Sequence, residues 1–70
     1  ERRRARRELA AVERRLSRLT AELADLDRAM TEHDPTDHVG LVALAERRDA
    51  LAAQVAELED RWLALAEAAD

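Results

Sequence analysis

The sequence predicts an all-α protein, an antiparallel two-helix coiled-coil hairpin, and three observations carry this prediction. Apolar residues recur at alternating steps of three and four in both halves of the chain, which is the heptad period of paired helices. The single proline, Pro35, lies between the two periodic segments, where it must end a helix. Ala, Leu and charged residues dominate, and the charged fraction of 40% is typical of long, solvated helices.

The first helix is expected over residues 2–33, followed by a turn at residues 34–36. Its seam of apolar residues is uninterrupted and consists of Leu9, Val12, Leu16, Leu19, Leu23, Leu26 and Met30. After the proline, Thr36 or Asp37 can accept a hydrogen bond from the first free amides of a new helix. We therefore expect the second helix to begin at about Asp37.

The second helix is expected over residues 37–69. Its seam consists of Leu41, Leu44, Arg48, Leu51, Val55, Leu58, Trp62, Leu65 and Ala69. A short turn between two long helices makes them antiparallel. The two seams then agree on one register, in which Leu19 faces Val55 and Leu23 faces Leu51.

Two residues of the second seam are unusual. Arg48 is its only charged member, and a charge at this position is costly unless the guanidinium reaches a carboxylate. Asp27 and Glu22 are the candidate partners, and such an ion pair would fix the register. Trp62 is expected to be a core anchor opposite Val12; the neighbouring Leu63 is expected to be exposed.

Several function classes are excluded by composition, and the chain is not expected to be an enzyme. A phosphate-cradling loop needs several glycines, whereas Gly40 is the only one. The absence of cysteine excludes disulfides and thiolate metal sites. Ser17 is several turns from both histidines, so no catalytic triad is expected. The uncharged stretch 39–45 is far too short to cross a membrane, and no cofactor is expected in this domain.

The histidines and aspartates at the turn allow two interpretations. His33, Asp34, Asp37 and His38 contain the imidazole and carboxylate groups that bind zinc. Asp is also common where a chain turns or a helix is capped. The second interpretation is favoured, and no metal site is predicted.

Charge is distributed very unevenly along the chain. Residues 1–18 contain eight arginines and three glutamates, a net charge of +5, whereas residues 19–70 contain four arginines and thirteen acids, a net charge of −9. Clustered arginines can bind phosphates without reading sequence. The predicted nucleic-acid-binding residues are Arg2, Arg3, Arg4, Arg6, Arg7, Arg14, Arg15 and Arg18. The alternative, that these arginines are a solvated face or pair with acids of the second helix, stays open at this point.

The sequence also resembles a known family over nearly its whole length. The Arg-rich start, the segment 7–16, the turn Thr36-Asp37-His38 and the Glu-x-x-Trp-Leu motif at residues 59–63 are similar to the C-terminal coiled-coil domain of ABC-F ATPases of the Uup type. The resemblance implies a cytoplasmic parent ATPase that uses ATP and Mg and has no membrane segment. It further implies that the C-terminal hairpin binds nucleic acid, either DNA or ribosomal RNA.

A longer parent protein is expected as well because the chain begins at Glu1 without an initiator methionine. An alternative function is then a protein-interaction or dimerisation coiled coil. Such a module would dock onto the parent ATPase domains or the ribosome, or form a weak homodimer.

Overall fold

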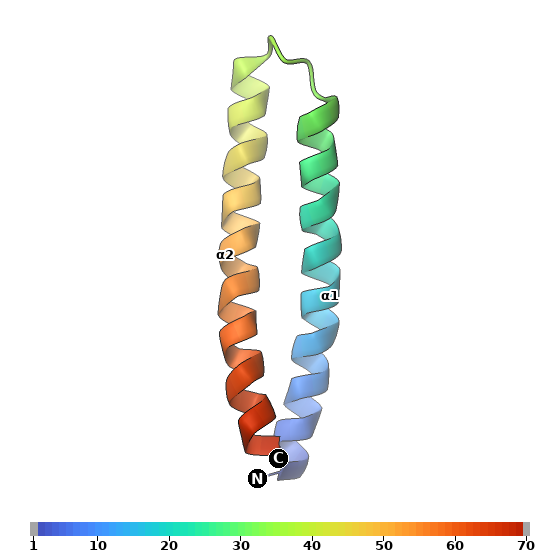
Figure 1. Ribbon diagram of the computed structural model, residues 1–70, viewed down its shortest axis with the longest axis vertical. Helices are drawn as coiled ribbons and strands as arrows, with labels where there is room; N and C mark the ends of the chain where they lie inside the picture. The colour runs from blue at the N-terminus through green and yellow to red at the C-terminus, as the bar shows by residue number, and fades with distance from the viewer. Residues whose placement is uncertain (1, 70) are drawn as a thin grey trace.

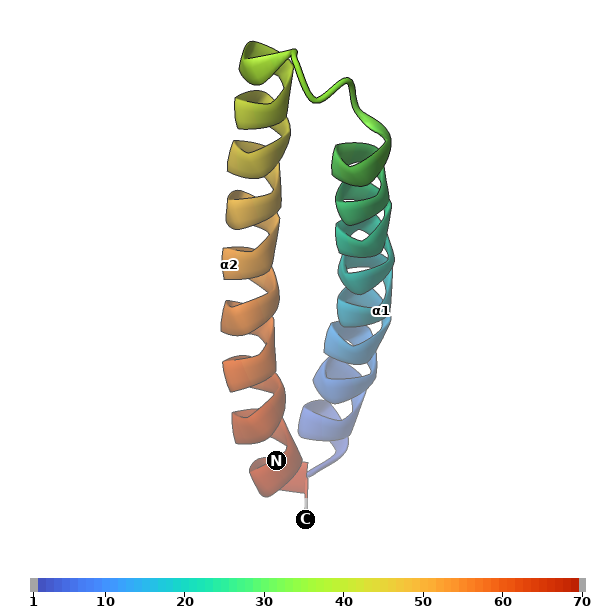
Figure 2. The ribbon, with the colours of Figure 1, turned by 45° about the horizontal axis from the view of Figure 1, so that its top comes forward.

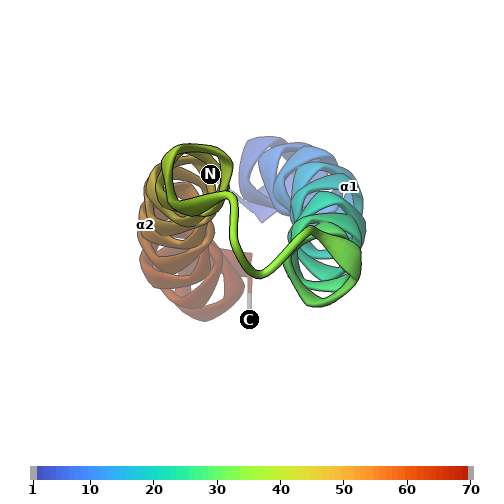
Figure 3. The ribbon, with the colours of Figure 1, turned by 90° about the horizontal axis from the view of Figure 1, so that it is seen from above.

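The computed structural model describes residues 2–69 as two helices, α1 over Arg2–Glu32 and α2 over His38–Ala69. The helices lie side by side and antiparallel, joined by one loop (Figure 1), and the molecule measures 53 × 14 × 12 Å. The pairing persists along the whole length when the molecule is turned (Figure 2). Seen from above, the helices wind around one another (Figure 3), as a strict heptad repeat requires. The predicted all-α hairpin is confirmed.

The core follows the predicted seams. The buried apolar residues of the described chain are Ala5, Val12, Leu19, Leu51 and Val55. Leu19, Leu51 and Val55 form one cluster, against which Leu16, Leu23, Leu26 and Leu58 pack while partly buried. This cluster contains both predicted pairs, Leu19 with Val55 and Leu23 with Leu51, so it supports the predicted register. The side of each helix that faces away from this seam is left to solvent.

Arg48 is accommodated in the seam by an ion pair across the two helices. Its Nε donates to Asp27 Oδ1, and its Nη2 lies 3.5 Å from Asp27 Oδ2. The hydrogen bond and the charge of this carboxylate raise the pKa of the Arg48 guanidinium. The guanidinium reaches solvent while its stem crosses the seam, since the side chain is 37% exposed. Of the two candidate partners, the structure therefore selects Asp27.

The loop is slightly longer than the expected turn. α1 ends at Glu32 and α2 begins at His38, so His33 and Asp37 are loop residues. The backbone N–H of Asp37 donates to Asp34 O over 3.1 Å, which closes a turn around Pro35. Asp37 lies just outside α2 because its side chain caps that helix.

Candidate nucleic-acid interface

The eight predicted contact residues are all exposed, but they lie on different sides of α1. Arg3, Arg7, Arg14 and Arg18 follow one another at steps of four, seven and four residues. These steps place them on one side of a helix, opposite the buried Ala5, Val12 and Leu19. We call these four residues the arginine face. It extends over about 22 Å at the usual rise per residue.

The acids of the same helix segment do not neutralise the arginine face because they turn toward α2. Glu8 Oε2 accepts a hydrogen bond from Arg61 Nη2 over 2.6 Å, and Glu13 Oε2 accepts one from the indole Nε1 of Trp62 over 3.1 Å. Glu8 and Glu13 are the only described acids among residues 2–18. Both acids of this segment therefore hold the two helices together.

Ion pairing distinguishes Arg28, Arg48 and Arg61 from the arginine face. Arg28 pairs with Asp25 at 3.2 Å, and Arg48 and Arg61 pair with Asp27 and Glu8. Between residues 2 and 69, no carboxylate lies within 4.0 Å of the guanidinium of any residue of the arginine face. Residues 2–69 thus provide no ion-pair partner for these four cations.

Arg6 and Arg15, which lie outside the arginine face, have other surroundings. Arg6 Nε is 3.5 Å from the carbonyl oxygen of Arg2, which is one turn earlier. Arg3, Arg6 and Arg7 surround the small side chain of Ala10 and line a shallow hollow of about 400 Å³. Arg15 instead lines a hollow of about 360 Å³ against α2, together with Glu57 and Arg61.

The aromatic and apolar residues near this end of the hairpin take the expected places. Trp62 is half-buried in the seam, and its indole N–H reaches Glu13 on α1. Its hydrogen bond to a specific acid was not predicted, because heptad positions place the ring but not its polar edge. Leu63 is 55% exposed, as expected for a residue beside the seam.

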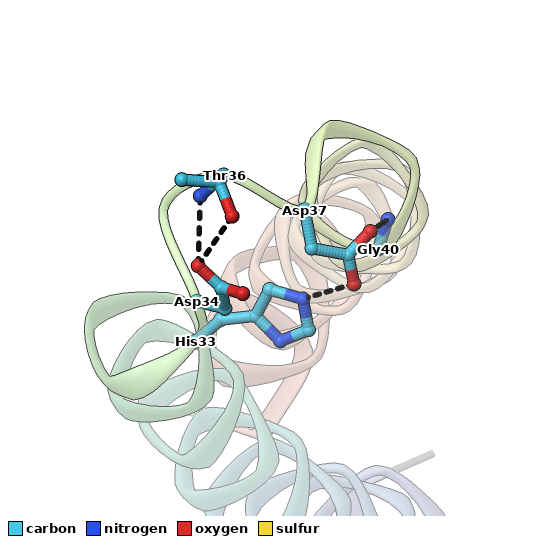
Figure 4. Close-up of polar contacts among 5 residues, drawn as sticks. All are labelled: His33, Asp34, Thr36, Asp37 and Gly40. Carbon is cyan, nitrogen blue, oxygen red and sulfur yellow. Dashed lines mark hydrogen bonds and ion pairs between the residues drawn. The ribbon is translucent and has the colours of Figure 1, made fainter.

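The loop is a second cluster of polar residues, and hydrogen bonds within it account for its composition (Figure 4). Asp34 Oδ1 accepts from the backbone N–H and the hydroxyl of Thr36, at 2.9 and 2.8 Å. Asp37 Oδ1 accepts from the backbone N–H of Gly40 at 3.1 Å, which is the geometry of a helix N-cap. Asp37 Oδ2 lies 2.8 Å from Nε2 of His33. One carboxylate therefore caps α2 and holds the imidazole that follows α1.

Gly40 makes this arrangement possible. A Cβ atom at position 40 would lie 2.5 Å from His33 Nε2 and closer still to Asp37 Oδ2, so any larger residue would displace the contact. Within residues 2–69, no group of three or more potential ligands is placed to hold a metal ion. The cluster has the hydrogen bonding of a capped turn.

The turn predicts a pH dependence of stability. Backbone donation from Thr36 and Gly40, respectively, lowers the pKa of Asp34 and Asp37 below the usual value of 3.8. A lowered folded-state pKa stabilises the fold above the unfolded pKa, and this contribution is lost as the pH falls through the folded value. We expect the melting temperature to fall below about pH 4, and less so in Asp37→Asn, which keeps a capping side chain without the charge.

Circular dichroism melts between about pH 2 and 6 would test this expectation, since that range includes the carboxyl pKa values. Glu59→Gln is a matched control because it removes an exposed carboxylate far from the loop. A pH profile of Asp37→Asn that coincides with that of the unchanged chain would contradict the assignment.

The fold and the arginine face define the class of domain to which this chain belongs, a helical hairpin with one cationic outer side. The chain belongs to the ABC transporter C-terminal domain family, whose profile matches residues 1–67. No match was found among curated proteins or among solved structures. Neither described helix is long and apolar enough to cross a membrane.

Proposed function

We propose that this chain is the nucleic-acid-binding C-terminal domain of a Uup-like ABC-F ATPase. In this proposal the parent protein is cytoplasmic, and its other domains bind ATP and Mg. Membership of the ABC transporter C-terminal domain family and the resemblance of the Glu-x-x-Trp-Leu tail support this assignment. In this proposal the hairpin binds phosphates and catalyses no reaction.

One observation carries the nucleic-acid part of the proposal. The nearby acids Glu8 and Glu13 are used between the helices, whereas Arg3, Arg7, Arg14 and Arg18 have no carboxylate partner among residues 2–69. Helical spacing gives these arginines one acid, Glu22 four residues after Arg18, and no ion pair joins these two residues. A row of unpaired guanidinium groups instead suits the phosphates of a duplex or of a folded RNA.

The mode of binding follows from the side chains that are present. Guanidinium groups bind phosphate oxygens strongly and in pairs of hydrogen bonds. Trp62 is the only aromatic residue of the chain, and it packs in the seam rather than among the arginines, so the face has no platform on which unpaired bases could stack. Binding is therefore expected to be independent of sequence and sensitive to salt.

A salt series with labelled duplex DNA and a labelled RNA hairpin tests the proposal. Each phosphate neutralised contributes a slope of about −0.9 to the logarithmic dependence of affinity on salt. With four arginines in contact, we expect a slope of about −3 to −4 on duplex DNA. Arg7→Glu/Arg14→Glu should abolish most of the binding, because it replaces two phosphate contacts with repulsion.

The matched control is Arg28→Glu/Arg47→Glu, which changes the net charge equally at exposed positions outside the arginine face. Its affinity should fall far less than that of Arg7→Glu/Arg14→Glu. Equal losses in the two variants would show that net charge alone matters. A folded chain that binds neither nucleic acid at low salt would refute the proposed function.

A further inference from the structure

The outward side of the first half of α2 carries more apolar residues than that of α1. Val39, Val42, Ala43, Ala50 and Ala53 are exposed and are spaced as one side of a helix, away from the buried Leu51 and Val55. We call these five residues the valine face. Val39 is 83% and Val42 56% exposed, so two β-branched side chains stand in solvent close to the loop.

This side of α2 departs from the usual pattern of a helix at a protein surface. Such a helix buries one apolar stripe and presents polar residues on the opposite side. α1 fits the pattern, since its outward side carries arginines. α2 has the seam on one side and, on the other, the valine and alanine residues of the valine face around Glu46. A helix with apolar residues on two sides is normally covered on both.

The charges beside the valine face indicate what covers it. Glu46 is exposed within this face, between Val42 and Ala50, and the exposed Asp49 lies at its edge; neither forms an ion pair within residues 2–69. Complementary charge across an interface favours association and suppresses wrong partners. A partner that covers the valine face is therefore expected to present apolar side chains with basic side chains beside them.

A second copy of the chain does not offer such a surface. Two valine faces in contact would bring Glu46 and Asp49 of one copy close to the same acids of the other, and like charges oppose association. The outward side of α1 has arginines, but the apolar residues beside them are small alanines such as Ala10, Ala11 and Ala21. Neither side of a second copy combines large apolar groups with basic ones.

We propose that the valine face binds a basic amphipathic helix of another protein. In this mode the apolar residues of the partner helix contact Val39 and Val42, and the alanines let the two backbones approach closely. Lysine or arginine side chains of the partner pair with Glu46 and Asp49. The recognition is that of a helix lying along a helical surface, read through residues at steps of three and four.

A synthetic peptide of about 18 leucine and lysine residues in an amphipathic order provides the probe, since this length forms a helix when bound. Its binding to the full chain is measured by fluorescence anisotropy. Val42→Glu is expected to weaken binding roughly tenfold, the loss that corresponds to removal of one buried anchor. Glu46→Arg should weaken it as well, because it places a positive charge against the lysines.

Leu63→Glu is the matched control. Leu63 is 55% exposed on the same helix, so this variant makes the same charge change on an equally exposed apolar residue outside the valine face. Its affinity should stay close to that of the unchanged chain. An equal effect of Val42→Glu and Leu63→Glu, or equally tight binding of a peptide with the same residues in scrambled order, would overturn the proposal. So would a dimer of the chain that Val42→Glu dissociates, because a second copy would then occupy the face.

Discussion

Leu51→Ala is expected to lower the free energy of unfolding by about 2–5 kcal/mol, the range for removing a buried leucine side chain. Leu51 is 8% exposed and belongs to the central cluster with Leu19 and Val55. The total stability of a chain of this length is roughly 3–10 kcal/mol. The substitution therefore removes a large part of the stability, since few residues share the core.

Thermal unfolding followed by circular dichroism measures this effect, and both helices are expected to melt in one transition. Neither helix has another partner within residues 2–69, so loss of the cluster removes the support of both. Leu63→Ala is the control: Leu63 is 55% exposed, and its truncation should change stability by less than about 0.5 kcal/mol. A chain with Leu51→Ala that melts like the unchanged protein would mean that the helices pair in another register.

The core could be predicted from the sequence because a heptad repeat is a local and regular signal. Ala5, Val12 and Leu19 are at seam positions, and all three are buried in the structure. The ion pair of Arg48 could also be anticipated, because a charge in a seam needs a carboxylate within reach. In both cases one repeating geometry decides which side of the helix meets the partner.

The partners of exposed polar groups could not be predicted in the same way. Helical spacing places Glu8 and Glu13 beside the seam, but rotamers on both helices decide that they bond to Arg61 and Trp62. The same limit applies to the arginines, since the sequence identifies a basic segment but not which members lack an acid. The loop depends on a close approach of His33 to Gly40, for which the sequence shows only a single glycine.

The valine face illustrates a different limit. The heptad period predicts the seam of α2, but it does not say whether the other apolar residues of this helix are covered. Only their exposure, 83% for Val39 and 56% for Val42, shows that the hairpin leaves them uncovered. The two outward sides of the molecule therefore differ in charge and in polarity, with arginines on α1 and valines beside acids on α2.

Arg48→Leu is expected to raise the melting temperature and to reduce the specificity of helix pairing. A polar residue at one seam position of a coiled coil fixes register and oligomeric state at a cost in stability. Leucine at position 48 would complete the apolar seam, and it would leave Asp27 exposed to water rather than buried, since that side chain is 52% exposed. The chain would then tolerate other registers and associate with further copies.

Asp27→Ala should have the opposite effect on stability. It leaves the Arg48 guanidinium at a seam position without its carboxylate, so the chain should melt below the unchanged protein. Arg47→Leu is the control for added apolarity, because Arg47 is exposed and lies beside the seam rather than in it. Melting experiments combined with sedimentation equilibrium separate stability from association. The contrary result would be an Arg48→Leu variant that melts below the unchanged chain and stays monomeric. In that case the ion pair would be a net source of stability, and the prediction that Arg48 fixes the register would be wrong.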